Sequence, residues 1–203
     1  MPFNSLTTAS TEDWRRIMAE ERTMPYGARA AGLLLTMLKE QRDDDCFGVP
    51  INTYQHCLQT ATRTANAGEL PELIVCSLFH DAAEKMAPFA HGAVIADILA
   101  PFVSERNEWL LRHHPVFQQY HFVERPGMDR HARDAFRDSP HFAYAANYCE
   151  IYDQNSFDPD FATLSLAHFE PIVESYFSGF NALDSLRIAR QRPISQLTPA
   201  SGV

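Results

Sequence analysis

The chain has 203 residues, 45% of them hydrophobic and 21% charged, which excludes disorder as its dominant state and favours one domain over residues 1–203. The net charge of −9 with neutral histidines disfavours a nucleic-acid partner. No apolar stretch approaches the roughly 18 residues of a membrane helix, so no membrane partner is expected. The first residues lack a basic flank followed by an apolar core, and no cysteines form a CxxC pair, so we expect a cytoplasmic protein without disulfides.

Helical periodicity extends over almost the whole chain and predicts an all-α fold, a compact bundle of about eight helices. Ser10 opens the first helix with a capping box, Pro71 suits the first position of another, and Pro115 is expected to end a third. The segments 43–50 and 125–131 are predicted loops, and residues 193–203 are a predicted flexible tail. Helices are predicted over 10–22, 27–41, 51–67, 71–85, 89–100, 104–112, 140–153 and 163–179.

The segment LIVCSLFHDAAEK carries the most informative pair of residues, His80 and Asp81, at the end of a strongly apolar run. An isolated His-Asp dipeptide is common by chance, and the simpler interpretation is a hydrogen-bonded histidine beside an N-cap aspartate. Further histidines and one aspartate lie in or next to other predicted helices. The candidate metal ligands are His56, His80, Asp81, His91, His114 and Asp153.

Imidazole and carboxylate groups suit iron, manganese or zinc, and the lack of a cysteine pair argues against a structural zinc site. Burying such groups is costly unless a metal satisfies them. Six ligands exceed what one ion usually takes from a protein, so the set predicts two ions bridged by Asp81. His113 can replace its neighbour on chemical grounds, but the six-residue spacing to Tyr120 favours His114. Residues 154–156 are expected to order Asp153 or to close the site.

The order of these ligands resembles that of the HD-domain superfamily of metal-dependent phosphohydrolases. With His91 and His114 it is most similar to the branch that contains 2-amino-1-hydroxyethylphosphonate dioxygenase and myo-inositol oxygenase. The resemblance covers residues 45–160, which would form the metal-binding core. It rests on INTYQH, HGAVIADIL, HPVFQQYHF and SPHFAYAANYCEIYDQ.

This resemblance implies an HD-domain bundle around a mixed-valent Fe(II)/Fe(III) pair. The implied partners are dioxygen and a small hydroxylated substrate, which can carry an amine and is cleaved at a C–C or C–P bond. Catalytic roles are predicted for Asp81, for Glu84, which stands where relatives often carry lysine or histidine, and for Lys85.

Substrate binding is predicted for Gln118, Tyr120 and Glu150. The resemblance leads us to expect lysine at position 118 and arginine at position 150, both of which would hold an anionic group. A neutral amide and a carboxylate grip a phosphonate less well, and Glu150 suits an amine or a polyol better. Glu150 can equally lie on a solvated helix face.

Two other functions compete with a diiron oxygenase. An HD-domain phosphohydrolase would use manganese, zinc or another divalent metal to activate water against a phosphate ester or a nucleotide. A non-catalytic sensor or scaffold would need no metal ligands, and the intact ligand set argues against it. The sequence gives no indication of the oligomeric state.

Overall fold

Helix α4 (Pro71–Phe79) lies at the centre of the molecule, and its residues from Leu73 to Phe79 are all buried. The computed structural model describes residues 3–46, 48–122 and 124–180. Within these ranges it contains eight α-helices and no strand, which confirms the predicted all-α fold class. The predicted tail at 193–203 lies outside the described residues. No helix in the described part combines the length and apolar character needed to cross a bilayer.

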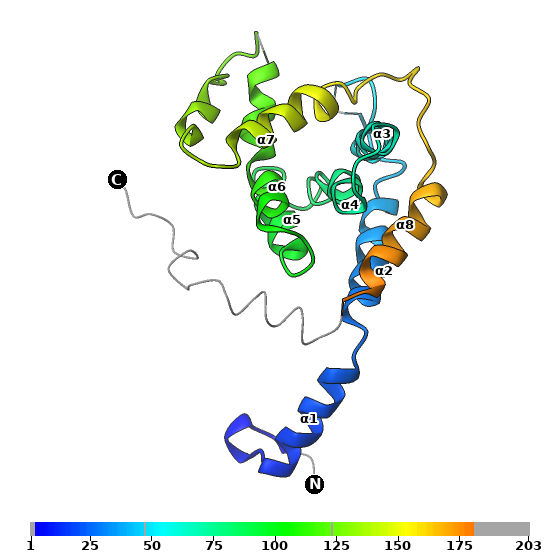
Figure 1. Cartoon of the computed structure of the whole chain (residues 1–203), viewed down its shortest axis with the longest axis vertical. Helices are drawn as coiled ribbons and strands as arrows, with labels where there is room; N and C mark the ends of the chain where they lie inside the picture. Colours follow the sequence, from blue (N-terminus) through cyan, green and yellow to red (C-terminus); the bar gives the residue numbers. More distant parts are fainter. Residues whose placement is uncertain (1–2, 47, 123, 181–203) are drawn as a thin grey trace.

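Most of the helices pack around α4 in Figure 1. Helices α3, α6 and α8 contact α4 directly, α5 packs on α6, and α2 packs on α8. Four short turns complete the fold: η1 (Leu6–Thr8), η2 (Gln119–His121), η3 (Ala132–Phe136) and the π-helical turn η4 (Cys149–Asp153). The other helices are α1 (Thr11–Thr23), α2 (Tyr26–Lys39), α3 (Thr53–Asn66), α5 (His91–Leu99), α6 (Glu105–Gln118), α7 (Phe142–Tyr148) and α8 (Leu166–Ser178).

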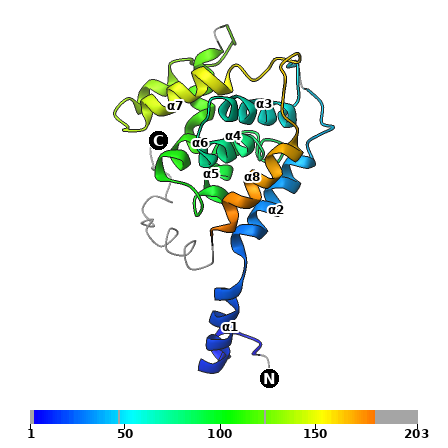
Figure 2. The same ribbon diagram turned by 45° about the vertical axis from the view of Figure 1, so that its right-hand side comes forward.

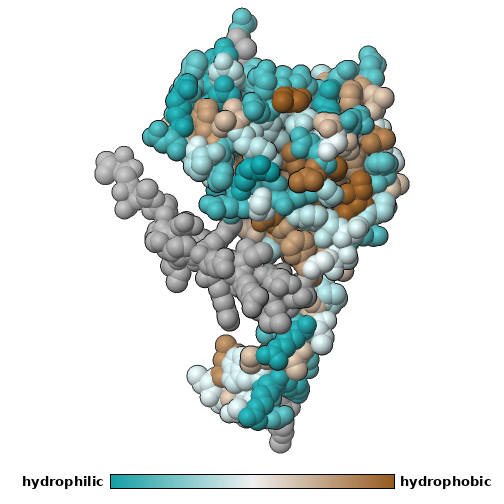
Figure 3. Space-filling view, in the orientation of Figure 1, coloured by the Kyte–Doolittle hydropathy of each residue, from teal (hydrophilic) through white to brown (hydrophobic). Residues whose placement is uncertain are grey.

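Helix α1 stands apart from the bundle in both Figure 1 and Figure 2, and none of its residues is buried. Its predicted capping box is present. The hydroxyl of Ser10 accepts a hydrogen bond from the Asp13 amide, and the Asp13 carboxylate accepts one from the Ser10 amide. On the face of the bundle shown in Figure 3, hydrophilic residues dominate and hydrophobic ones form small separate patches.

Two predicted helix ends are wrong. The helix predicted over 71–85 ends at Phe79, and His80 caps it, so the His-Asp pair lies just beyond the regular helix. The helix predicted to end near Pro115 continues through this residue to Gln118. Both differences have physical causes at the candidate site.

Gly27 is the point of closest approach between α2 and α8. A Cβ atom at this position would collide with the backbone carbonyl oxygen of Phe177. We expect Gly27→Ala to lower the free energy of unfolding by about 1–3 kcal/mol, because backbone atoms cannot rotate away. Gly32, in the same helix, has open space around it, so Gly32→Ala should raise stability by about 0.5–1 kcal/mol. Urea denaturation followed by circular dichroism measures both changes, and equal stabilities for the two variants would contradict this packing.

Candidate metal centre

The structure brings all six predicted ligands together, although they come from five different parts of the chain. His56 lies in α3, His80 and Asp81 follow α4, His91 begins α5, His114 lies in α6, and Asp153 ends η4. Four of them are at most 3% exposed: His56, His80, His114 and Asp153. Asp81 and His91 keep 16% and 14% of their side chains exposed, which leaves the centre open on one side.

The first half of the centre surrounds one oxygen of Asp81. The Nε2 atoms of His56 and His80 each lie 3.4 Å from Asp81 Oδ2. Asp153 Oδ1 lies 3.2 Å from His56 Nε2 and 3.7 Å from His80 Nε2. His56, His80 and Asp81 thus form a group that could hold a metal ion, with Asp153 beside it.

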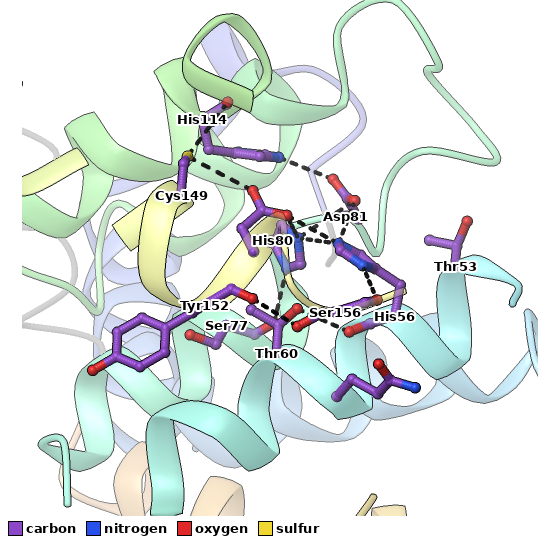
Figure 4. Close-up of polar contacts among 12 residues, drawn as sticks. Thr53, His56, Thr60, Ser77, His80, Asp81, His114, Cys149, Tyr152 and Ser156 are labelled. Atoms are coloured by element: carbon purple, nitrogen blue, oxygen red, sulfur yellow. Dashed lines mark hydrogen bonds and ion pairs between the residues drawn. The ribbon is translucent and has the colours of Figure 1, made fainter. Parts of the chain in front are cut away.

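The second half uses the other oxygen of the same carboxylate. Asp81 Oδ1 lies 2.9 Å from His114 Nε2 and 3.2 Å from His91 Nε2. These three residues form a second group that could hold a metal ion. In Figure 4 the Asp81 side chain lies between His114 on one side and His56 on the other. One carboxylate therefore serves both groups, as the sequence predicts for a bridging ligand.

Each of the four histidines is fixed by a backbone carbonyl that accepts a hydrogen bond from its Nδ1 atom. The acceptors of His56, His80, His91 and His114 are the carbonyls of Ser156, Ser77, Pro88 and Leu111, at 2.8, 2.8, 3.2 and 2.7 Å. A neutral imidazole that donates from Nδ1 has an unprotonated Nε2, which is the form that binds metals. In this neutral form all four Nε2 atoms would present lone pairs toward Asp81 or Asp153.

The contact between His56 Nε2 and His80 Nε2 is only 3.0 Å. With both Nδ1 atoms donating to carbonyls, the two Nε2 lone pairs face each other and repel unless a proton or a cation lies between them. Both side chains are buried, so water does not relieve this repulsion. The donor set of four imidazoles and two carboxylates thus fits divalent or trivalent transition metals.

The carbonyls that accept from His80 and His114 lack a helical donor, because α4 ends shortly after Ser77 and α6 contains a proline. Ser77 lies in the last turn of α4, where carbonyls have no intrahelical donor. Pro115 has no N–H, so it leaves the carbonyl four residues earlier, that of Leu111, without its helical partner. The Nδ1 atom of His114 donates a hydrogen bond to this carbonyl, which explains why a proline is tolerated inside α6.

A π-helical turn orients Asp153. The Gln154 amide donates to the Cys149 carbonyl at 3.0 Å, and the Asn155 side chain donates to the Glu150 carbonyl at 2.9 Å. The Cys149 thiol donates to Asp153 Oδ2 at 3.8 Å. Residues 154–156 thus contact the turn that carries Asp153, and the Ser156 carbonyl also accepts a hydrogen bond from His56.

Burial and charge act in opposite directions on the pKa values of the cluster. Burial disfavours the ionised form of Asp81, but His80, His114 and His91 outweigh it and hold the pKa of Asp81 well below its ordinary value. Burial lowers the pKa of His114. It opposes protonation of His80 and His91 as well, yet Asp81 raises the pKa of both. The centre therefore combines an ionised Asp81 carboxylate with two imidazoles of raised pKa, His80 and His91, and with His114, whose pKa is lowered.

A cavity of about 640 Å³ opens beside the centre. Its lining includes Asp81, His91, His114 and Asp153. Gln118, predicted to bind substrate, also lines this cavity and is buried. The sequence reasoning did not identify several other lining residues, which come from a predicted loop and from helix ends: Phe89, Arg112, Gln119, Phe122, Arg125 and Met128.

The two predicted catalytic residues that are not metal ligands, Glu84 and Lys85, lie in different surroundings. Glu84 lines the cavity and accepts a hydrogen bond from Thr53 Oγ1 at 2.7 Å. Lys85 is mostly exposed, pairs with Asp44 at 2.6 Å, and lines a different cavity of about 550 Å³ that Glu84 also borders. The structure therefore places Glu84, and not Lys85, in the same cavity as the centre.

Tyr120 and Glu150 do not line the cavity of the centre. Tyr120 lies under two guanidinium groups, those of Arg130 and Arg133. The Glu150 side chain is 63% exposed, and one of its oxygens is 3.9 Å from His121 Nε2. Their substrate-binding roles stay predictions.

His113 is not part of the cluster. Its Nδ1 atom donates to the Trp109 carbonyl at 2.8 Å, and its ring stacks on that of Trp109 with centroids 4.1 Å apart. Of the two adjacent histidines, His114 is the one whose Nε2 atom reaches Asp81.

No protein-family model matches this chain, and no curated protein matches it. The resemblance to HD-domain enzymes therefore stays a prediction made from the ligand pattern. What the structure adds is a buried His/Asp group that could hold metal ions within an all-α fold.

Proposed function

We propose that the protein is a diiron oxygenase of the HD-domain type, which uses dioxygen to cleave a C–C or C–P bond of a small hydroxylated substrate. One observation carries the proposal: the two oxygens of Asp81 face two separate groups of histidines, so one carboxylate is placed to bridge two ions. His56, His80 and Asp153 would complete the first site, and His91 and His114 the second. A bound iron pair would supply the redox chemistry with dioxygen that the ligand pattern implies.

The chain's own residues would prepare the substrate for this reaction. The open side of the centre, next to Asp81 and His91, faces the cavity and gives a substrate hydroxyl access to it. Gln118 and Glu84 offer polar groups on the cavity wall, and apolar lining residues such as Phe122 would limit the access of water. Their shared role is to hold one orientation of the substrate.

A phosphohydrolase is the second candidate, and the cavity lining favours it in one respect. The guanidinium groups of Arg112 and Arg125 line the cavity, although Arg112 also pairs with Asp97 and Glu108. A bridged pair of metal ions can also activate water against a phosphate ester. Metal identity and substrate turnover separate the two candidates.

The deciding experiment is anaerobic purification of the full chain, followed by metal analysis and electron paramagnetic resonance. We expect about two iron ions per chain, with a coupled mixed-valent signal after partial oxidation. His113→Ala is a suitable control, because this residue adjoins a ligand but stacks on Trp109, and it should keep the metal content. Zinc or manganese together with turnover of a phosphate ester would support the hydrolase instead. A chain that binds no metal would contradict both functions.

A further inference from the structure

Unsatisfied polar atoms gather in one segment next to the metal cavity. Within the described residues, six buried side-chain nitrogen or oxygen atoms have no hydrogen-bond partner, and four of them belong to residues 118–133. Leaving such groups buried without a partner is costly, and native proteins rarely do so without a reason. The four atoms are Gln118 Oε1, His121 Nε2, Arg130 Nε and Arg133 Nε.

Three of the four atoms are nitrogens, and two of these belong to arginine guanidinium groups, each of which carries one positive charge. The guanidinium carbons of Arg130 and Arg133 lie 4.6 Å and 3.4 Å from the centroid of the Tyr120 ring. Neither arginine forms an ion pair in the part of the chain that the structure describes, although acidic residues outnumber basic ones by 26 to 17. Two cations held on one ring repel each other, and a bound anion would remove this repulsion.

The nearby carboxylates are engaged elsewhere or point into solvent. Asp134 pairs with Arg137 at 3.0 Å and lies 3.7 Å from His131. Asp129 accepts a hydrogen bond from the His131 amide. Glu150 is 3.9 Å from His121 Nε2, beyond hydrogen-bond distance, and its side chain is largely exposed. None of these carboxylates neutralises the two arginines.

The same segment forms one wall of the cavity that contains the metal centre. Gln118, Gln119, Phe122, Arg125 and Met128 line this cavity, and Tyr120 and His121 lie between Gln119 and Phe122 in the chain. Burial lowers the pKa of His121, Glu150 opposes this, and Arg133 lowers the pKa further, as expected for an imidazole close to a cation.

We infer that Arg130, Arg133 and His121 are the binding groups of an oxyanion-binding subsite beside the metal cavity. Arginine suits a planar or tetrahedral oxyanion because its guanidinium group donates two parallel hydrogen bonds. The positive charges that are missing at positions 118 and 150 are thus supplied by Arg130 and Arg133. The assignment of this oxyanion to the substrate rests on the proposed function, whereas the subsite itself does not. Its ligand is a phosphoryl or a carboxylate group.

The test is titration of the full-length protein with inorganic phosphate and, separately, with acetate, by isothermal titration calorimetry at constant ionic strength. We expect Arg130→Met and Arg133→Met each to weaken anion binding about tenfold or more, because each removes one charge-assisted contact. Arg137→Met is the matched control, since Arg137 is a nearby arginine that pairs with Asp134. This variant should bind the anion as the wild type does. Tighter binding of phosphate identifies a phosphoryl ligand, and tighter binding of acetate identifies a carboxylate.

The same titration in the metal-loaded and the chelator-treated protein separates this inference from the proposed function. If anion binding depends on the two arginines in both the metal-loaded and the chelator-treated protein, the subsite is supported, even if no iron is found. If anion binding requires the metal and is unchanged by both arginine substitutions, the proposed subsite is overturned. The proposal of a metal centre is not affected by this result. Arg130→Lys and Arg133→Lys keep the charge and are used if a methionine variant does not fold. In that case, a phosphate-dependent rise in melting temperature that is equal in the wild type and both lysine variants overturns the subsite.

Discussion

Asp81→Ala is expected to lose both metal ions, so that metal content falls from about two ions per chain to about none. The reason is the shared carboxylate: Oδ2 faces His56 and His80, and Oδ1 faces His91 and His114. Single ligands on either side should have smaller effects. His56→Ala should remove the ion of the first site, and His91→Ala that of the second.

Metal content is measured by mass spectrometry after anaerobic reconstitution and dialysis, with circular dichroism to confirm that each variant is folded. Asp160→Ala is the matched control, because Asp160 is an exposed aspartate that belongs to neither group that could hold a metal ion. If Asp81→Ala retained one ion at full occupancy, the carboxylate would not be a shared ligand. If His56→Ala and His91→Ala lost the same ion, the centre would hold one ion and not two.

The His/Asp cluster could be predicted from the sequence because its members are chemically distinctive and each lies in or next to a helix. His80 and Asp81 follow an apolar run, and His91 and His114 lie in segments with clear helical periodicity. The capping box at Ser10 could also be predicted, because it depends only on two residues that are three positions apart. Local patterns therefore gave the helices and the composition of the centre.

Helix ends were harder to predict because they depend on the centre itself. The periodicity of the fourth helix continues past His80, but the ring of His80 takes the Ser77 carbonyl where the regular helix ends. Pro115 is a helix breaker by its own chemistry, yet α6 continues because His114 donates to the carbonyl that the proline leaves free. In both cases a tertiary requirement outweighs a local preference.

The basic cluster around Tyr120 shows the same limit of sequence reasoning. Arg130 lies in a segment predicted as a loop, and nothing in the spacing of Arg130 and Arg133 indicates that both stack on one ring. The resemblance predicts cationic side chains at positions 118 and 150, where this chain carries glutamine and glutamate. Only the folded arrangement reveals that other arginines lie close to Tyr120 and His121.

Gly92 connects the packing of the fold to the second metal site. It follows His91 in α5, and it faces the part of α6 that carries His114. A Cβ atom at Gly92 would lie 2.8 Å from Pro115 Cγ and 2.9 Å from the Leu111 carbonyl oxygen. The proline ring and the backbone cannot rotate away, so α5 and α6 must separate.

Gly92→Ala is therefore expected to weaken the second site selectively, leaving about one ion per chain, and to lower the free energy of unfolding by about 1–3 kcal/mol. A separation of the two helices moves His91 and His114, now 3.2 Å and 2.9 Å from Asp81 Oδ1, out of reach of a common ion. His56 and His80 lie outside the two helices and should keep the first ion. Gly32→Ala, which meets open space, is the control for a glycine-to-alanine change within a helix. Equal loss of both ions in Gly92→Ala would contradict the selective effect. It would mean that the contact between α5 and α6 supports both sites.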